Sequence, residues 1–399
     1  MRLSKPNHAA PRYLPPLSYR SSTALLRPSS APSRHVPILR GDKAGKSDGI
    51  TPQSRYTSAA SRNGTIEVVT ESVDSAFSRS GGLATTAELL TLGVSKDQLR
   101  WWTRSGQVTA IAWGVYSPTA WLKGVADDPR RMHAVALGAI IKRNPDLVAS
   151  HESAAYLHGI DLLLPTGTTV PRVTLTRRSQ AHSRSLVRGA LIRVAMLPDS
   201  HVTTVLGVPV TTVARTVMDI ARTTGFMEGV VAADSALRGH LAIKVEFAIT
   251  LQGCAQWKGI VRARQVLDFA DGRAESALES VARVRFAQFG IAPPGLQVNI
   301  RGVHGFIGRA DFCWHEYRTI AEADGALKYA DQGRDRARAQ LARDEKFHDA
   351  GWGTFHFTWR EIYHEPAPTI DRLRRTFARN RPRPRQPGQQ GPPQPRRPR

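Results

Sequence analysis

The stretch GRADFCWHEYRTIAEADG, residues 308–325, decides the fold predicted for the C-terminal part of the chain. Two runs of apolar and aromatic residues flank a polar centre, a pattern typical of a β-hairpin. Carboxylates stand inside both runs, although Asp and Glu are normally rare in strands. With the turn centred on Glu316 and Tyr317, the numbers of antiparallel partners add to 633, so Asp311 lies opposite Glu322.

This hairpin gathers charges on one face. The same register places Arg309 opposite Asp324, and Asp324 shares the face of Glu322 because side chains alternate along a strand. Three carboxylates that close together repel one another, and a cation that prefers oxygen ligands, Mg²⁺ or Mn²⁺, would relieve the repulsion. Alternatively, Arg309 neutralises Asp324, and the other two acids lie at a solvated hairpin end. The spacing favours neither interpretation over the other.

The segments around the hairpin complete a predicted domain over residues 271–365. An amphipathic helix over 274–289 comes first, followed by a strand over 297–300, the hairpin, a charged helix over 334–350 and a strand over 354–359. The order of elements is αβββαβ. Glu275 and Glu279 are four residues apart on the first helix and therefore share a face.

This order, with acids where the second and third strands meet, resembles the restriction-endonuclease-like PD-(D/E)XK fold. It resembles more closely the uncharacterised bacterial domains related to very-short-patch-repair (Vsr) endonucleases. The residues that carry the resemblance are Glu275–Ser280, Arg309–Asp311, Glu322–Gly325, Arg343–Lys346 and Gly351-Trp352. The resemblance implies a metal-dependent endodeoxyribonuclease that hydrolyses DNA phosphodiesters.

The resemblance also implies the residues of the site. Asp311, Glu322 and Glu279 (or Glu275) would be the ligands of Mg²⁺ or Mn²⁺, with no organic cofactor. In such nucleases the metal lowers the pKa of a bound water and neutralises charge that develops on the phosphate.

Three supporting positions differ from the general pattern. Asp324 stands where the general motif has Lys, although the Vsr-like domains often read Glu-x-Asp-Gly here. Those domains commonly have a His shortly after this Gly, and this sequence has Lys328 instead. As a point charge, Lys328 would orient the water or stabilise the phosphorane. His356 stands where a basic residue is usual. The catalytic set implied is Asp311, Glu322, Asp324, Lys328 and Glu279. Because the supporting groups are altered, a catalytically weak or inactive relative of these nucleases remains the alternative.

Residues 63–122 carry the second informative pattern. A short helix is predicted over 85–92, and residues 95–98 (SKDQ) then match a capping box that opens a second helix. That helix stops at Gly106, and two short strands follow it, with their pivot near residues 113 and 114. Helix, tight turn, helix and β-ribbon indicate a winged helix-turn-helix.

The second helix of such a unit lies in the major groove of DNA, with its N-terminal residues nearest the bases. The polar candidates for DNA contact are Lys96, Gln98, Arg100 and Arg104. Leu99 and one of Trp101 and Trp102 should face the core. The alternative is a small helical domain whose polar face is merely solvated.

The order of elements from Gly82 to Tyr116 resembles the N-terminal domain of AbiEi-type abortive-infection antitoxins. In the mixed α/β region over 123–270, the successions at 150–159 (SHESAAYLHG) and 212–219 (TVARTVMD) resemble the C-terminal region of those antitoxins. They are transcriptional repressors of type IV toxin–antitoxin operons. The resemblance implies an alternative function, a non-catalytic regulator whose nuclease fold is degenerate. Its partners would be DNA and a cognate toxin or a second copy of the chain.

The middle region is expected to alternate helices and strands. Helices are predicted over 131–141 and 153–158, strands over 171–176 and 191–194, and a strand leading into a helix over 208–221. A basic run follows the first of these strands and contains Arg177, Arg178, Arg184, Arg188 and Arg193. This run is either a phosphate-contacting surface or an ordinary solvated loop.

The chain has a formal net charge of +23, and much of it stands at the two ends. A basic chain suggests a polyanionic partner, nucleic acid first. Residues 1–62, rich in Ser, Pro and Arg, are predicted to be a disordered basic tail, and residues 366–399 a basic Pro/Arg tail. An acid-poor start rich in Arg and Ser can also mimic an organellar transit peptide.

Cys254 and Cys313 are the only cysteines, which excludes a disulfide framework or a Cys-based zinc site and fits a reducing compartment. No apolar run approaches the ~18 residues that span a bilayer, so a cytoplasmic protein without a membrane partner is expected. The predicted fold is α/β and multidomain, with a winged helix-turn-helix, an α/β middle domain, a C-terminal αβββαβ restriction-endonuclease-like domain and disordered tails.

Overall fold

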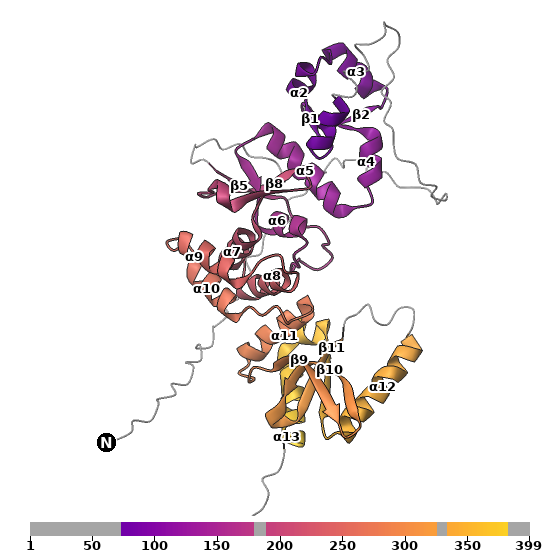
Figure 1. Cartoon of the computed structure of the whole chain (residues 1–399), viewed down its shortest axis with the longest axis vertical. Coiled ribbons are helices and arrows are strands. Elements are labelled where there is room, and N and C mark those ends of the chain that lie inside the picture. Colours follow the sequence, from indigo (N-terminus) through magenta and orange to yellow (C-terminus); the bar gives the residue numbers. More distant parts are fainter. Residues whose placement is uncertain (1–72, 179–188, 325–332, 382–399) are drawn as a thin grey trace, which may run out of the picture. The chain divides into compact units, whose positions relative to one another are not determined.

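The computed structural model of the chain describes residues 73–178, 189–324 and 333–381 (Figure 1). Within these ranges it is a mixed α/β protein with a three-, a five- and a four-stranded sheet, ordered β1-β3-β2, β6-β5-β4-β8-β7 and β12-β11-β10-β9. The predicted tail over 1–62 and the candidate Lys328 lie outside the described residues.

The N-terminal described part builds a small core around two helices. After a helical stretch over 73–79, its elements are β1 (Ala84–Thr85), α2 (Thr86–Thr91), α3 (Lys96–Arg104), β2 (Val108–Ala112), β3 (Val115–Pro118) and α4 (Thr119–Val125). Val73 and Phe77 of the first stretch pack against Leu89, Leu99 and Trp102 of the two helices that follow. The helix over 73–79, β1 and α4 were not expected from the sequence.

Both short helices begin where their capping residues predict. Ser95 and Gln98 form the predicted capping box of α3: the Gln98 backbone N–H donates to the Ser95 hydroxyl at 3.1 Å, and the Gln98 side chain accepts from Ser95 N–H. Thr85 and Glu88 make the same reciprocal pair at α2. The strand pivot is also confirmed, because Gly114 adopts φ +72°, a conformation that favours glycine.

The described residues of the middle part contain the five-stranded sheet and six α-helices that precede, interrupt and follow its strands along the chain. Its elements are α5 (Pro129–Arg143), β4 (Leu147–Ala149), α6 (His151–His158), β5 (Thr174–Arg177), β6 (Leu191–Val194), η1 (Asp199–His201), β7 (Val202–Val205), β8 (Val208–Thr211), α7 (Val213–Thr223), α8 (Phe226–Arg238), α9 (Lys244–Gly253) and α10 (Ile260–Phe269). The predicted helices and strands are all present. β4 and β8 are parallel neighbours, with Ala149 opposite Val210.

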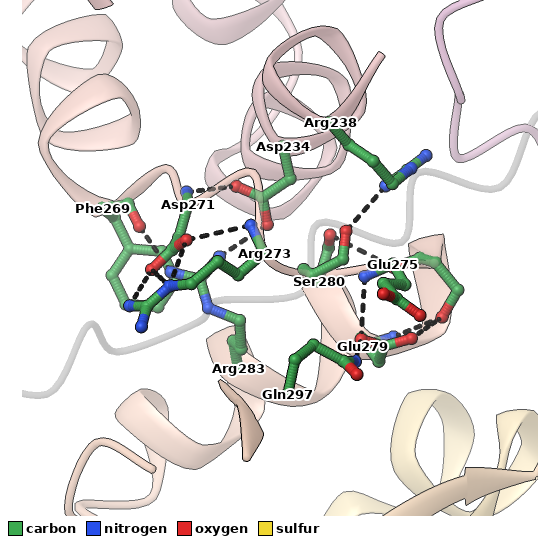
Figure 2. Close-up of polar contacts among 12 residues, drawn as sticks. Asp234, Arg238, Phe269, Asp271, Arg273, Glu275, Glu279, Ser280, Arg283 and Gln297 are labelled. Atoms are coloured by element: carbon green, nitrogen blue, oxygen red, sulfur yellow. Dashed lines mark hydrogen bonds and ion pairs between the residues drawn. The ribbon is translucent and has the colours of Figure 1, made fainter. Parts of the chain in front are cut away.

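Helices α7 to α10 share one apolar core with the start of the C-terminal part. Val284 belongs to that core, and Val231 of α8 belongs to the core of the C-terminal sheet. A buried carboxylate reinforces the contact: Asp234 of α8 accepts from Arg283 Nη1 at 2.6 Å and from Asp271 N–H at 2.7 Å (Figure 2).

The C-terminal part has the predicted order αβββαβ. It consists of α11 (Ala277–Gln288), β9 (Gly295–Gly302), β10 (Gly305–Trp314), η2 (His315–Tyr317), β11 (Thr319–Asp324), α12 (Gly333–Asp349) and β12 (Gly353–Thr358). Phe312 lies opposite Ala321 and Trp314 opposite Thr319, pairs whose numbers add to 633, so the predicted hairpin register is confirmed. β12 runs parallel to β11.

The prediction of a tail from residue 366 is wrong for its first half. A π-helical turn, η4 (Arg360–His364), leads into α13 (Pro366–Asn380). Ile370, Leu373 and Phe377 of α13 are buried in the core of the sheet. Their spacing forms one apolar stripe, and Pro366 suits the first turn of a helix. The Arg and Pro content of the segment hid this pattern.

Candidate functional site

Helix α3 presents a basic face to solvent. Lys96, Arg100 and Arg104 are exposed and are called the α3 face below. On the opposite side Leu99 and Trp102 are each 4% exposed, which confirms the predicted core side. Gln98 is half-buried and is engaged in the capping box, so it is less available to a ligand than its three basic neighbours.

A cleft of about 360 Å³ runs along this face. It is lined by Thr86, Lys96, Leu99, Arg100, Thr103, Arg104 and Tyr116. Asp97 is the acid beside it, with Oδ1 2.9 Å from Arg100 Nη1 and 89% of its side chain exposed. A fully solvated pair of this kind contributes little to folding and exchanges readily for another partner.

The tip of the β2–β3 ribbon adds two residues that the sequence did not single out. Trp113 is 85% exposed, and the Arg143 guanidinium of α5 lies 5.6 Å from the centre of its ring. The signal for Trp113 in the sequence was its position directly before the turn glycine Gly114. Arg143 becomes adjacent to it through tertiary packing, so no sequence signal identified that residue.

The predicted site acids Glu279, Asp311, Glu322 and Asp324, called the acidic cluster below, lie on α11, β10 and β11. Glu279 is 5% exposed and accepts from Glu275 N–H at 2.8 Å (Figure 2). It also accepts from the Ser276 hydroxyl at 2.8 Å. Burial raises the pKa of Glu279, and the negative charge of Asp311 raises it further.

Gln297 of β9 bridges two of the acids. Its Nε2 lies 2.9 Å from Glu279 Oε2 and 3.3 Å from Asp311 Oδ1. Asp311 also accepts from the Ala323 backbone N–H at 2.9 Å, which ties its carboxylate to β11. Gln297 was not identified in the sequence, because an amide on a strand carries no signal of its own.

Glu322 is paired with an arginine. It is 7% exposed, and its Oε2 accepts from Arg343 of α12. Burial raises the pKa of Glu322 to about 7, although the positive charge of Arg343 opposes the rise. The other oxygen, Oε1, is buried without a hydrogen-bond partner. Arg343 thus supplies the positive charge that the sequence assigned to a cation.

Asp324 and Arg309 do not pair as the register suggested. Arg309 Nη2 lies 2.6 Å from Glu275 instead. The reason is that β10 at this point pairs with β9, where Arg309 faces Asn299, and Glu275 stands before α11 within reach. Asp324 lies 3.3 Å from His356 Nδ1.

His356 links two acids of different elements. Its Nε2 lies 3.1 Å from Asp344 of α12, while its Nδ1 faces Asp324. The hydrogen bond to Asp324 raises the pKa of His356, and the charge of Asp344 adds to the effect. His356 of β12 thus joins β11 and α12 through these two acids.

The acidic cluster brings the predicted ligands together without forming a cation site. Among the residues that the structure describes, no group of three or more His, Cys, Asp or Glu side chains is arranged to hold a metal ion. Glu279 and Asp311 share an amide donor, Glu322 has a guanidinium and Asp324 an imidazole. As they stand, these residues do not fit Mg²⁺ or Mn²⁺, which require several free oxygens at one point.

The basic run of the middle part does not form one surface. Arg177 is 4% exposed, with Nε 2.9 Å from Asp146, so a phosphate-contacting role is wrong for it. Arg178 pairs with Asp199 at 2.8 Å, and Arg193 is half-buried. Arg184 and Arg188 lie outside the described residues.

Comparison with known proteins identifies the middle of the chain. Residues 112–269 match the family model of the AbiEi antitoxin C-terminal domain. Two uncharacterised proteins of Mycobacterium tuberculosis, one from each of two strains, are 32% identical to the chain over 172 residues. That alignment covers 42% of this chain and 61% of each relative, so the chain spans less than two thirds of their length.

No helix in the described ranges is long and apolar enough to cross a membrane. The matched region begins in the β2–β3 ribbon and ends with α10, and it contains both successions that resembled the AbiEi C-terminal region. The match bears out that resemblance for the middle of the chain: residues 112–269 are similar to the AbiEi antitoxin C-terminal domain.

Proposed function

We propose that the protein is a DNA-binding transcriptional regulator of the antitoxin kind, acting in the cytoplasm on the genes of a toxin–antitoxin pair. The observation that carries the proposal is the AbiEi domain at 112–269, which directly follows a helical unit with an exposed basic face. A cognate toxin, encoded with the protein, is the further partner that this function implies.

The part before the AbiEi domain acts in this proposal as a winged helix-turn-helix. α3 enters the major groove with Lys96 nearest the bases, and Arg100 and Arg104 neutralise phosphates. The ribbon tip, with Trp113 beside Arg143, contacts the flanking backbone. Three facts support this arrangement: the solvent exposure of the α3 face, its cleft, and the weak competition from Asp97.

The C-terminal part serves in this proposal as a degenerate nuclease fold that stabilises the chain or contacts a partner. The support is the internal pairing of its acids, above all the bond between Arg343 and Glu322. Charges that are already paired inside the protein have little to offer an external cation.

A metal-dependent endonuclease is the second candidate. One property of Glu322 favours it: Oε1 is buried without a hydrogen-bond partner. Its Mg²⁺ would be held by Glu279, Asp311 and Glu322, with Asp324 and Lys328 in support. The bonds of these acids to Gln297 and Arg343 would first have to open. A Mn²⁺ titration followed by electron paramagnetic resonance tests it: saturable Mn²⁺ binding that Asp311→Asn abolishes would favour the nuclease.

DNA binding is tested by fluorescence anisotropy with labelled duplexes that tile the DNA upstream of the protein's own gene. The variant Lys96→Ala/Arg100→Ala/Arg104→Ala is expected to lose at least about 100-fold in affinity at low salt. The slope of log K against log salt should become shallower by about 2, roughly one for each of the two phosphates that Arg100 and Arg104 no longer neutralise.

The matched control is Lys244→Ala/Lys258→Ala/Arg264→Ala, which removes the same charge from exposed positions on and between α9 and α10. It should bind DNA with nearly the wild-type affinity. If both triple variants lose the same affinity, net charge rather than the α3 face carries the binding, and the proposal fails.

A further inference from the structure

A buried polar centre lies in the AbiEi domain where two parallel strands end. Ser150 and His151 follow β4, and Thr212 follows its parallel neighbour β8. Ser150 and Thr212 are the N-caps of α6 and α7, and neither makes a side-chain capping bond. The carboxyl ends of parallel strands, followed by helix N-termini, commonly form binding sites for anions.

Arg215 of α7 brings an unsatisfied donor to this centre. The residue is 0% exposed, its Nε donates to Asp219 at 2.8 Å, and its Nη1 donates to the Met196 carbonyl at 3.2 Å. Nη2 is buried without any partner. The ring of Trp257 lies 4.5 Å from the guanidinium carbon and fixes its plane. A buried donor without an acceptor is costly, so Nη2 requires one.

His151 provides a second unsatisfied group. It is 0% exposed, it has φ +51°, and its Nε2 is buried without a partner. Thr176 donates to the Ser150 hydroxyl at 2.8 Å, and that hydroxyl lies 2.9 Å from His151 Nδ1. We assign the Ser150 hydroxyl as the donor to Nδ1, an arrangement that places the ring proton on Nε2 and makes Nε2 a donor.

The surroundings of His151 are positively charged. Burial lowers the pKa of His151 to about 3, and the charges of Arg193, Arg222 and Arg215 lower it while Asp219 opposes them. All four groups are thus within electrostatic range of the ring. Asp219 is shared, accepting from both Arg215 and Arg222 at 2.8 Å. Three guanidinium groups against one carboxylate leave a net positive charge in a mostly buried place.

We propose that this centre binds a small oxyanion of the phosphate type, which accepts from Arg215 Nη2 and His151 Nε2. Such an ion would satisfy both orphan donors and offset the excess positive charge. Arg193, whose Nε is also buried without a partner, contributes further attraction. The site is separate from the α3 face and goes beyond the proposed DNA binding.

Equilibrium dialysis of the full chain with radiolabelled inorganic phosphate tests the site directly. High chloride screens the basic surface of the chain, so that only a specific site retains phosphate. The wild type is expected to bind one phosphate per chain, and Arg215→Gln none. At ten times the Kd, phosphate should raise the thermal midpoint of the wild type by about 3–6 °C.

Arg264→Gln is the matched control, since this arginine is exposed on α10 of the same domain, and it should keep the bound phosphate. If Arg215→Gln does not fold, Arg193→Gln is expected to weaken phosphate binding at least tenfold. Competition by sulfate and not by acetate supports the phosphate-type site. Absence of saturable uptake by the wild type, equal uptake by a folded Arg215→Gln, or equal competition by acetate overturns it.

Discussion

The α3 face and the acidic cluster are both dense in charge, but the charges of the first face solvent and those of the second are paired inside the protein. Lys96, Arg100 and Arg104 point into solvent, and the acid beside them is itself almost fully solvated. In the acidic cluster, Glu322 is paired with Arg343, and Gln297 bridges two other acids. Charges that face water can serve an external ligand, whereas charges paired inside the protein are already engaged.

The largest expected effect separates the two sides of α3. Trp102→Ala should lower the free energy of unfolding of the N-terminal part by about 3–5 kcal/mol, because Trp102 is 4% exposed in its core. Trp101→Ala is the matched control, since Trp101 is 38% exposed, and it should change stability by about 0.5 kcal/mol or less. Urea unfolding followed by circular dichroism measures both, and equal destabilisation by the two variants would contradict the assigned orientation of α3.

The next largest effect is the pH dependence of stability that Glu322 causes, which tests whether this acid of the cluster is buried and partly protonated. The pKa of Glu322 is about 7 in the folded chain against an ordinary 4.5, so the folded state binds more protons between these values. The contribution of Glu322 to stability should therefore fall as pH rises from 4.5 to 7, by about 1–3 kcal/mol. The buried histidines His133 and His151, whose pKa values are lowered, contribute in the opposite direction, so the effect is measured as the difference between wild type and Glu322→Gln in urea unfolding across that range.

Glu316→Gln is the control for that experiment, because Glu316 is exposed in the turn of the same hairpin. Its pH dependence should match that of the wild type. A further measurement at pH 8 compares unfolding with and without Mg²⁺. If Mg²⁺ stabilises the wild type and Glu322→Gln abolishes that stabilisation, the acids serve a cation, and the contrast between the two regions fails.

The smallest effect sharpens the description of the α3 face. Asp97→Asn should raise DNA affinity by about threefold, because it frees Arg100 and removes a negative charge from the face. Asp371→Asn is the control, since Asp371 and Arg374 form a similarly exposed pair three residues apart on α13. Anisotropy titrations compare the two variants, and an equal rise in affinity would show that net charge alone is responsible.

Local patterns made much of the fold predictable from the sequence. The capping box at 95–98 and the hairpin register that pairs Phe312 with Ala321 depend on neighbours along one helix or one hairpin. Hydrophobic periodicity likewise gave Leu99 and a neighbouring Trp as the inner side of α3. Such features are fixed by short-range geometry, and the structure confirms them.

The pairing of the site charges could not be predicted in the same way. Arg309 binds Glu275 and Arg343 binds Glu322, across contacts that join a strand to a separate segment. The partner of such a charge depends on tertiary packing, which sequence spacing does not specify. The charge of Arg215 comes within electrostatic range of His151 in the same way, through tertiary packing between α6 and α7.

The most direct test of regulation against cleavage uses one sample and one substrate. Full-length protein is incubated with a supercoiled plasmid that carries the DNA upstream of its gene, with Mg²⁺ or Mn²⁺, and the products are resolved on an agarose gel. The prediction is retardation without nicking, with retardation abolished in the Lys96→Ala/Arg100→Ala/Arg104→Ala variant. Metal-dependent nicking by the wild type that Asp311→Ala abolishes would contradict the account.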